Sequence, residues 1–285
     1  MSFDPRVTPA RPDLAARHLK GRVTAERFAD PVTYVVTAAV APVRRGPSPD
    51  AECDTEALMG ERVFVYDIAD AGWCWGQLES DGYVGWLPTA ALGRDGPAPT
   101  HRVAALRTLI FPGPSIKLPP VASPPLGARL AVARADGPLA ELEAGAGFVP
   151  LRHLAPLDAF EADWVAVAEH FIGTPYLWGG KSTAGIDCSG LVQVSLSACG
   201  IACPRDSDMQ ERALGEALDV AGGLPPLRRG DLVFWKGHVA LVRDEATLIH
   251  ANAFHMAVAV EPIIEAITRI RAAGSDVIAV KRLSF

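Results

Sequence analysis

Hydrophobic and polar positions along this chain follow two different patterns, and the change falls near residue 158. From residue 31 to about 157, short apolar runs nearly alternate with polar residues and are separated by Gly and Pro. Alternation puts every second side chain on one face of a strand, so such runs predict small β-barrels. The runs are YVVTAAVAPV, ERVFVYDIA, WCWGQLE and GYVGWLP, followed by the weaker HRVAALRTLIF, ARLAVARA, PLAELE and GFVPLRHL.

An imperfect internal repeat divides this β-rich region. GYVGWLPTAAL in the first half is matched by GFVPLRHLAPL in the second, and the Pro/Gly-rich GRDGPAPT lies between the halves. Repeats of this kind indicate duplicated units, and Pro/Gly clusters indicate a linker. We therefore predict tandem barrels at 31–98 and 99–157. Residues 1–30 are predicted to form a polar N-terminal arm with a short helix near Pro12 to Lys20.

From residue 158 to residue 285 the pattern predicts helices first and an antiparallel sheet afterwards. DAFEADWVAVAEHFIG has helical spacing of apolar residues and a stop at Gly173, and LVQVSLSACG predicts a buried helix that ends near Gly200. RDSDMQERAL predicts another helix, capped by Ser207 or Asp208. The strand-like runs that follow are LVFW, HVALV, TLIHA, VAVEP and VIAVKRL. This order makes the fold class of the region α+β.

Composition and charge narrow the function classes. The net charge is −6 with a pI near 5.7, so the chain lacks the basic patch that a nucleic-acid partner requires. No apolar run reaches the ~20 residues of a membrane helix. The N-terminal residues lack the apolar core of a secretory signal, so we expect no membrane partner and a cytoplasmic location. The sequence gives no oligomeric state.

The cysteines do not form a metal-binding or disulfide pattern. There are five, an odd number without paired CxxC motifs, which fits a reducing compartment. Cys199 and Cys203 are spaced like metal ligands, but no second pair of ligands accompanies them, so we expect no metal and no cofactor. Cys53, Cys74, Cys199 and Cys203 are interpreted as small buried hydrophobic residues.

Cys188 differs from the other cysteines in its position. In GTPYLWGGKSTAGIDCSGL a glycine-rich loop enters a helix at this residue. The unpaired N–H groups of a helix start favour negative charge on sulfur, and they can also stabilise a developing oxyanion. Gly190 keeps the approach to the sulfur uncrowded. We therefore predict that Cys188 is a nucleophile with a lowered pKa.

Two histidines lie on the hairpin predicted from GHVALVRDEATLIHAN. If its loop has an odd number of residues centred on Asp244 or Glu245, His238 and His250 share one face of the sheet; an even loop separates them. An odd loop gives a nucleophile–base–orienter series, in which His238 takes the thiol proton and His250 orients His238. His255, in NAFHMAV, is the alternative to His250.

Four spaced motifs resemble the NlpC-type cell-wall cysteine peptidases: PYLWGGKSTAGIDCSGL, PRDSDMQ, RRGDLVFWKGHVALV and LIHAN. The resemblance covers about 160–285 and implies a papain-like core. It implies that Cys188 is the nucleophile, His238 the base and His250 the polar orienter. It also implies that the Tyr176 hydroxyl assists the oxyanion site.

The stretch DTEALMGERVFVYDIADAGWCWGQLESDGYVGWLP resembles the SH3-like domain that precedes this core in cytoplasmic murein-peptide peptidases. Those enzymes cut between γ-D-glutamate and an L-diamino acid and require a free N-terminal L-alanine. The resemblance thus implies a murein tripeptide or tetrapeptide as substrate, release of L-Ala-γ-D-Glu, and a first barrel that narrows the cleft. The second barrel departs more from the pattern.

A set of side chains is implied to bind this substrate. A buried ammonium needs anionic partners, and Asp187 resembles the ammonium ligand of the family. Glu56 is a second candidate for that role, and Tyr83 can add a hydroxyl. The positions that resemble ligands of the γ-D-Glu unit are Ser189, Asp206 and Ser207, and Trp178 of the loop is also expected at the substrate. Asp187 and Asp206 have an alternative interpretation as plain helix caps.

Two other functions remain open from the sequence. Papain-like cores support several acyl-transfer reactions, so an amidase or acyltransferase acting on another small substrate is one alternative. The other is a non-catalytic cell-wall-binding module that acts through its barrels.

Overall fold

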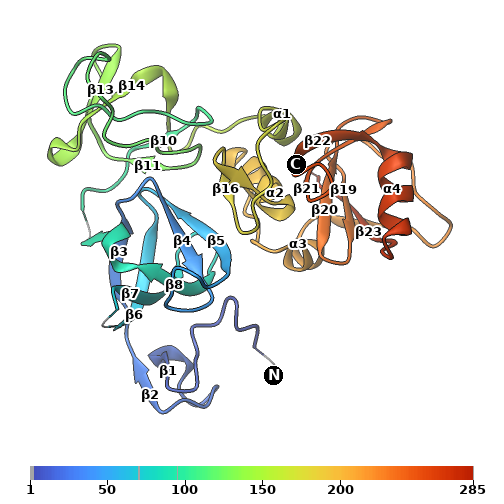
Figure 1. The fold of residues 1–285 in the computed structure, drawn as a ribbon, viewed down its shortest axis with the longest axis horizontal. Helices are drawn as coiled ribbons and strands as arrows, with labels where there is room; N and C mark the ends of the chain where they lie inside the picture. The colour runs from blue at the N-terminus through green and yellow to red at the C-terminus, as the bar shows by residue number, and fades with distance from the viewer. Residues whose placement is uncertain (1–2, 70, 95, 285) are drawn as a thin grey trace. The chain divides into compact units, whose positions relative to one another are not determined.

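The structure is a computed structural model that describes residues 3–69, 71–94 and 96–284. The chain divides into two compact units, residues 1–157 and 158–285, drawn from blue to green and from yellow to red in Figure 1. No helix in these described ranges is long and apolar enough to cross a membrane. The finer domain limits predicted from the sequence stay predictions.

The N-terminal arm is not the short α-helix expected near Pro12 to Lys20. It contains β1 (Leu14–Ala16), a single 3-10 turn η1 (Arg17–Leu19) and β2 (Arg27–Ala29), and the two strands pair in parallel. Leu14 and Leu19 are buried in a cluster with Tyr66 and Trp75 of the first barrel. Packing on the barrel and pairing with β2 therefore determine the conformation of these residues, and the local helical pattern does not.

The first barrel is one twisted antiparallel sheet. Its elements are β3 (Val32–Val36), β4 (Val40–Arg44), β5 (Cys53–Leu58), β6 (Arg62–Ala69), β7 (Trp73–Leu78), β8 (Val84–Pro88), η2 (Thr89–Ala91) and β9 (Leu92–Arg94). The strand order is β5-β4-β8-β7-β6-β3-β9. Alternate side chains form the core, among them Val43, Val63, Leu78 and Leu87. The run YVVTAAVAPV thus contains two strands, β3 and β4.

The second barrel is built from shorter strands. They are β10 (His101–Val103), β11 (Arg129–Leu130), β12 (Val132–Arg134), β13 (Leu139–Leu142), η3 (Glu143–Gly145), β14 (Phe148–Pro150), η4 (Leu151–His153) and β15 (Leu154–Pro156). They form sheets of order β11-β10-β15 and β12-β13-β14. Val103, Ile110, Leu130 and Val149 belong to a separate buried core. This core explains why the weaker apolar runs still fold.

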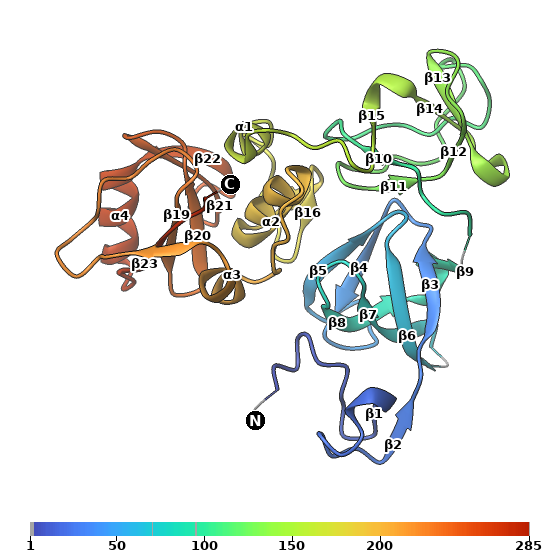
Figure 2. The ribbon, with the colours of Figure 1, turned by 180° about the vertical axis from the view of Figure 1, so that it is seen from behind.

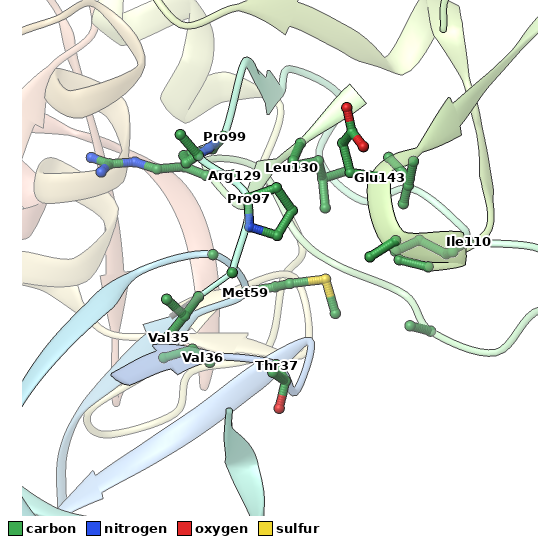
Figure 3. Close-up of a pocket in the computed structure, with 18 of the residues that line it drawn as sticks. Val35, Val36, Thr37, Met59, Pro97, Pro99, Ile110, Arg129, Leu130 and Glu143 are labelled. Atoms are coloured by element: carbon green, nitrogen blue, oxygen red, sulfur yellow. The ribbon is translucent and has the colours of Figure 1, made fainter. Parts of the chain in front are cut away.

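A cavity of about 630 Å³ lies inside residues 1–157, where the two barrels meet (Figure 3). Val35, Val36 and Met59 line it from the first barrel, and Ile110 and Leu130 line it from the second. The backbones also touch, because the Arg129 N–H donates a hydrogen bond to the Met59 carbonyl oxygen at 2.8 Å.

Residues 158–285 combine helices with an antiparallel sheet. The helices are α1 (Trp164–Glu169), α2 (Cys188–Ala198), α3 (Ser207–Ala213) and α4 (Ile263–Ala272). The strands are β16 (Lys181–Ser182), β17 (Gly185–Ile186), β18 (Glu216–Leu218), β19 (Leu232–Trp235), β20 (His238–Val242), β21 (Thr247–Asn252), β22 (Ala257–Pro262) and β23 (Val277–Arg282). The main sheet has the order β18-β23-β19-β20-β21-β22.

This sheet lies between helices, with α2 on one side and α4 on the other in both views (Figures 1 and 2). Helix α4 was not predicted, although Ile263, Ala266 and Ile270 have helical spacing. These residues pack with Ala240 and Leu248 of the sheet. Helix α4 and the antiparallel sheet therefore form one hydrophobic core together, as the α+β prediction requires.

The predicted helix limits differ from the structure at two places. Asp163 caps α1 by accepting hydrogen bonds from the backbone N–H groups of Val165 and Ala166. The helix therefore starts after the first part of the predicted run DAFEADWVAVAEHFIG, and the Phe160 side chain in that part is largely exposed. Ser207 is the first residue of α3 and Asp206 holds the N-cap position, without a side-chain capping bond. The prediction that Ser207 or Asp208 caps α3 is therefore wrong by one or two residues.

Replacing Gly60 by Ala should weaken the join between the barrels. Gly60 has a φ of +83°, and a Cβ there would overlap the Arg129 carbonyl oxygen. We expect Gly60→Ala to lower the free energy of unfolding by about 2–4 kcal/mol, from backbone strain plus overpacking. Gly72→Ala is the control, because Gly72 has a φ of +80° with nothing within 4 Å of the added Cβ. It should cost about 1 kcal/mol. Equal shifts of the two urea midpoints would contradict this steric account.

Candidate active site

A buried ion pair holds the start of α2. Asp187 is the N-cap residue, and its Oδ1 accepts hydrogen bonds from the Gly190 N–H at 2.7 Å and the Ser189 hydroxyl at 3.3 Å. Its Oδ2 accepts from the Gly179 N–H at 2.8 Å. Arg205 donates to both oxygens, at 2.9 and 2.7 Å, and its side chain is only 1% exposed. These bonds fix the glycine-rich loop against the first turn of the helix.

Gly190 is needed because backbone passes close to α2. A Cβ at this position would overlap the carbonyl oxygen of Gly180, which belongs to the loop before the helix. The sequence predicted that Gly190 leaves room at the sulfur of Cys188; in the structure it leaves room for the backbone of the loop. Cys188 itself is buried, at 7% exposure.

The Cys188 sulfur lies among backbone donors but is cut off from water. The N–H groups of Val239 and Ser189 face it. Burial, and next the negative charge of Asp187, nevertheless raise the pKa of the Cys188 thiol to about 12. The expectation of a lowered pKa at the helix start is contradicted, because loss of hydration outweighs the backbone donors and the Arg205 charge. In this structure Cys188 is a neutral thiol.

The hairpin register brings the predicted histidines together. Leu241 pairs with Ile249, so the loop between β20 and β21 is centred on Glu245, one of the two odd-loop positions predicted. His250 then lies opposite Ala240, diagonal to His238 and on the same face. His238 Nε2 lies 2.9 Å from His250 Nδ1. His255, the alternative, is exposed and contacts Asn252.

A carboxylate stands behind the second histidine. Glu261 Oε2 lies 2.8 Å from His250 Nε2, and Arg269 of α4 donates to Oε1 at 3.0 Å and to Oε2 at 2.5 Å. Burial alone raises the pKa of Glu261, but the hydrogen bonds from His250 and Arg269 outweigh it and bring the pKa to about 2. Burial, with His250 and Arg269, lowers the pKa of His238 to about 3. At neutral pH, Glu261 is therefore ionised and His238 is an uncharged base.

Tyr176 is half-buried near Cys188 and Asp187. Its N–H donates to the Met256 carbonyl oxygen at 2.9 Å. Burial, then the charges of Cys188 and Asp187, raise the pKa of its phenol. The hydroxyl consequently stays protonated and can donate a hydrogen bond, as its predicted oxyanion role requires.

The remaining predicted residues have different surroundings. Ser189 accepts a hydrogen bond from Arg205 at 2.8 Å and belongs to the Asp187 cluster. Asp206 and Ser207 begin α3 directly after Arg205, and Trp178 is 62% exposed. Their substrate contacts stay predictions.

Glu56 and Tyr83 belong to the other unit. Glu56 lies on β5 and Tyr83 precedes β8, and both are buried in residues 1–157. Their predicted roles at the substrate amine stay predictions.

Three residues of the site were missed by sequence reasoning: Arg205, Glu261 and Arg269. Arg205 stands inside the motif PRDSDMQ, and Glu261 is a charged residue within the apolar run VAVEP. Arg205 and Glu261 were therefore visible signals in the sequence, because charged residues are rarely buried unless they are paired. In the described part of the chain, no group of three or more His, Cys, Asp and Glu residues could hold a metal ion.

The papain-like class of cysteine peptidases is defined by three features. They are a buried cysteine at a helix N-terminus, a histidine on an antiparallel strand, and a polar residue that contacts this histidine. Comparisons with known proteins identify the family within this class. The model of the NlpC/P60 family matches residues 173–273, and that of the bacterial dipeptidyl-peptidase Sh3 domain matches residues 43–92. The chain therefore contains an NlpC/P60 domain of the cysteine-peptidase class at residues 173–273 and a bacterial SH3 domain at residues 43–92.

Similar proteins match this chain over different lengths. A dipeptidyl-peptidase 6 of Lysinibacillus sphaericus is 37% identical over 33% of this chain and 33% of its own length. A gamma-D-glutamyl-L-lysine dipeptidyl-peptidase of Bacillus cereus is 29% identical over 74% of this chain and 70% of its own length. The crystal structure of an NlpC/P60 family protein from Bacillus cereus has a TM-score of 0.73 at 21% identity and covers 88% of this chain and 99% of that one, which supports the fold.

The protonation of Cys188 can be tested without a substrate. We expect the difference in thiolate absorbance near 240 nm between the wild type and Cys188→Ser to show no step between pH 4 and about pH 9, because burial raises the pKa of Cys188. The difference removes the signal of the other cysteines. A thiolate step near pH 4 would show instead a resting thiolate–imidazolium pair, and would contradict the neutral site.

Proposed function

We propose that the protein hydrolyses peptides derived from peptidoglycan, at the bond between γ-D-glutamate and the L-diamino acid, and releases L-Ala-γ-D-Glu. The observation that carries this proposal is the contact of His238 with His250, together with the Val239 N–H beside His238 that faces the Cys188 sulfur, in an NlpC/P60 domain that follows a dipeptidyl-peptidase Sh3 domain. The names of the Bacillus relatives, gamma-D-glutamyl-L-lysine dipeptidyl-peptidases, support the choice of bond.

The geometry supports acylation and deacylation through one base. His238 takes the thiol proton as the Cys188 sulfur attacks the γ-carbonyl carbon, so the charged nucleophile forms only during attack. The Tyr176 hydroxyl and backbone N–H groups at the start of α2 supply donors for the oxyanion. His238 then protonates the leaving amine of the diamino acid. In the second half, His238 activates water, which hydrolyses the thioester and frees the dipeptide.

Substrate selection is proposed to depend on a free N-terminal amine. An ammonium that leaves water needs an anionic partner, and Asp187, Glu56 and the hydroxyl of Tyr83 are the proposed groups. Arg205 already neutralises much of the Asp187 charge, so Asp187 by itself is a weak partner for an ammonium.

Cleavage of a defined peptide tests the reaction. Wild-type protein should release L-Ala-γ-D-Glu from L-Ala-γ-D-Glu-L-Lys or from the diaminopimelate tripeptide, measured by mass spectrometry. Cys188→Ala should lose the activity to background, because the nucleophile is gone. Cys199→Ala is the matched control, since Cys199 lies at the other end of α2, and it should remain active. No release by the wild type, or equal release by Cys188→Ala, excludes this function; transfer of the acyl group to an added amine in place of hydrolysis favours an acyltransferase.

Blocking the substrate amine tests the proposed specificity. N-acetylation of the alanine removes the ammonium charge and leaves the proposed carboxylates unpaired, so kcat/KM should fall by at least about 100-fold. The free and acetylated peptides should be compared at equal concentration with the same enzyme. Equal rates would show that the site does not recognise the amine, while leaving the cleavage reaction itself intact.

A further inference from the structure

Three side chains cross the main sheet in a diagonal line. His250 pairs in register with Ala259 on β22, and Leu248 pairs with Glu261. Glu261 is therefore displaced from His250 by two residues, as His250 is from His238 on the other side. Because side chains alternate along strands, the two histidines and the carboxylate share one face. Each step is bridged by a contact, at 2.9 Å between the histidines and 2.8 Å between His250 and Glu261.

The hydrogen-bonding capacity of these groups restricts where protons can lie. The ionised Glu261 carboxylate can only accept hydrogen bonds. His250 Nε2 must therefore carry a proton, and while this is the only proton on the ring, His250 Nδ1 is an acceptor. His238 Nε2 must donate to that acceptor. Nδ1 of His238 is then unprotonated. Because Nε2 of His238 is engaged with His250, Nδ1 is the ring nitrogen available to take the proton of Cys188.

We propose that Glu261 is a positioning residue of the peptidase: its carboxylate, held by Arg269, fixes the tautomers of His250 and His238 so that Nδ1 of His238 is the base. The proposal rests on the cysteine-peptidase chemistry proposed for Cys188. Glu261 acts through His250 and does not touch the substrate. Arg269 orients the carboxylate, because it donates to both oxygens from α4 and leaves Oε2 directed at His250.

The same sheet offers a control for a merely structural role. Asp231 is 2% exposed and accepts hydrogen bonds from Arg282 at 2.8 and 2.6 Å. It also accepts one from the Arg228 N–H at 2.8 Å. This is another buried carboxylate–arginine pair, with Asp231 directly before β19 and Arg282 on β23, and none of these bonds involves a histidine. Losing it should cost stability without changing any tautomer in the active site.

The experiment compares Glu261→Leu, Glu261→Gln and Asp231→Asn with the wild type by ¹⁵N NMR of labelled histidine. His238→Gln and His250→Gln assign the two rings. In the wild type we expect both rings to carry the proton on Nε2. Glu261→Leu removes the acceptor, so the His250 proton should redistribute to Nδ1, and the His238 proton should follow. Glu261→Gln can keep its amide oxygen toward His250, where Arg269 also donates, and should retain the wild-type tautomers.

Kinetics should follow the tautomers. Glu261→Leu should lower kcat by about 10- to 100-fold, the scale on which partners that orient a functional histidine act, with KM changed less than about twofold. Glu261→Gln should recover most of that loss. Alkylation of Cys188 by iodoacetamide should slow in the same order, and it requires no peptide. Asp231→Asn should retain the kcat and the tautomers of the wild type even if it unfolds at lower temperature.

Several results would overturn the inference. They are a proton on Nδ1 of His238 in the wild type, unchanged tautomers in Glu261→Leu, or an equal loss of kcat in Asp231→Asn. The NMR and alkylation readouts also separate this inference from the proposed function, since they stand even if the wild type does not cut the murein peptide. If the tautomers are as expected but the murein peptide is not cleaved, the proposed substrate is rejected and the positioning role of Glu261 stands.

Discussion

The ion pair between Asp187 and Arg205 is the interaction on which the catalytic site depends. Burying two opposite charges costs several kcal/mol per ion, and only close geometry with additional hydrogen bonds offsets that cost. Both oxygens of Asp187 are engaged by Arg205, and backbone N–H groups of the loop and of α2 satisfy the carboxylate further. One carboxylate thus joins the loop, the helix start and the segment before α3. Cys188 directly follows Asp187, so its position is set by this pair.

The same burial that makes these bonds strong also sets the protonation of the site. Water is displaced from the sulfur of Cys188 and from the ring of His238, so each group is more stable uncharged. A resting ion pair would need both charges in a poorly hydrated place. The neutral pair instead makes proton transfer part of the attack on the substrate. Catalysis then depends strongly on which nitrogen of His238 is free, because only an unprotonated nitrogen can accept the thiol proton.

Local patterns in the sequence predicted one half of this site well. Counting residues across the hairpin reduced the question to whether its loop is odd or even, because the period of a strand is two. The structure has the odd loop, centred on Glu245, which puts His238 and His250 on one face. Glu261 could not be placed in the same way, since its position depends on the pairing of β22 with β21. The low pKa predicted for Cys188 was wrong for a related reason: a helix start is visible in the sequence, whereas the tertiary packing that dehydrates the sulfur is not.

Two carboxylate–arginine pairs flank the reacting groups, and their net charges are close to zero. Asp187 with Arg205 stands behind the nucleophile, and Glu261 with Arg269 stands behind the base. The opposing effects on His238 illustrate the consequence: the charge of Glu261 raises its pKa while that of Arg269 lowers it. A carboxylate that is paired with an arginine therefore acts on the site mainly by orienting its hydrogen-bond partners, and less through its charge. Such an arrangement can orient the loop, the helix and both imidazole rings while leaving Cys188 and His238 uncharged until a substrate carbonyl arrives.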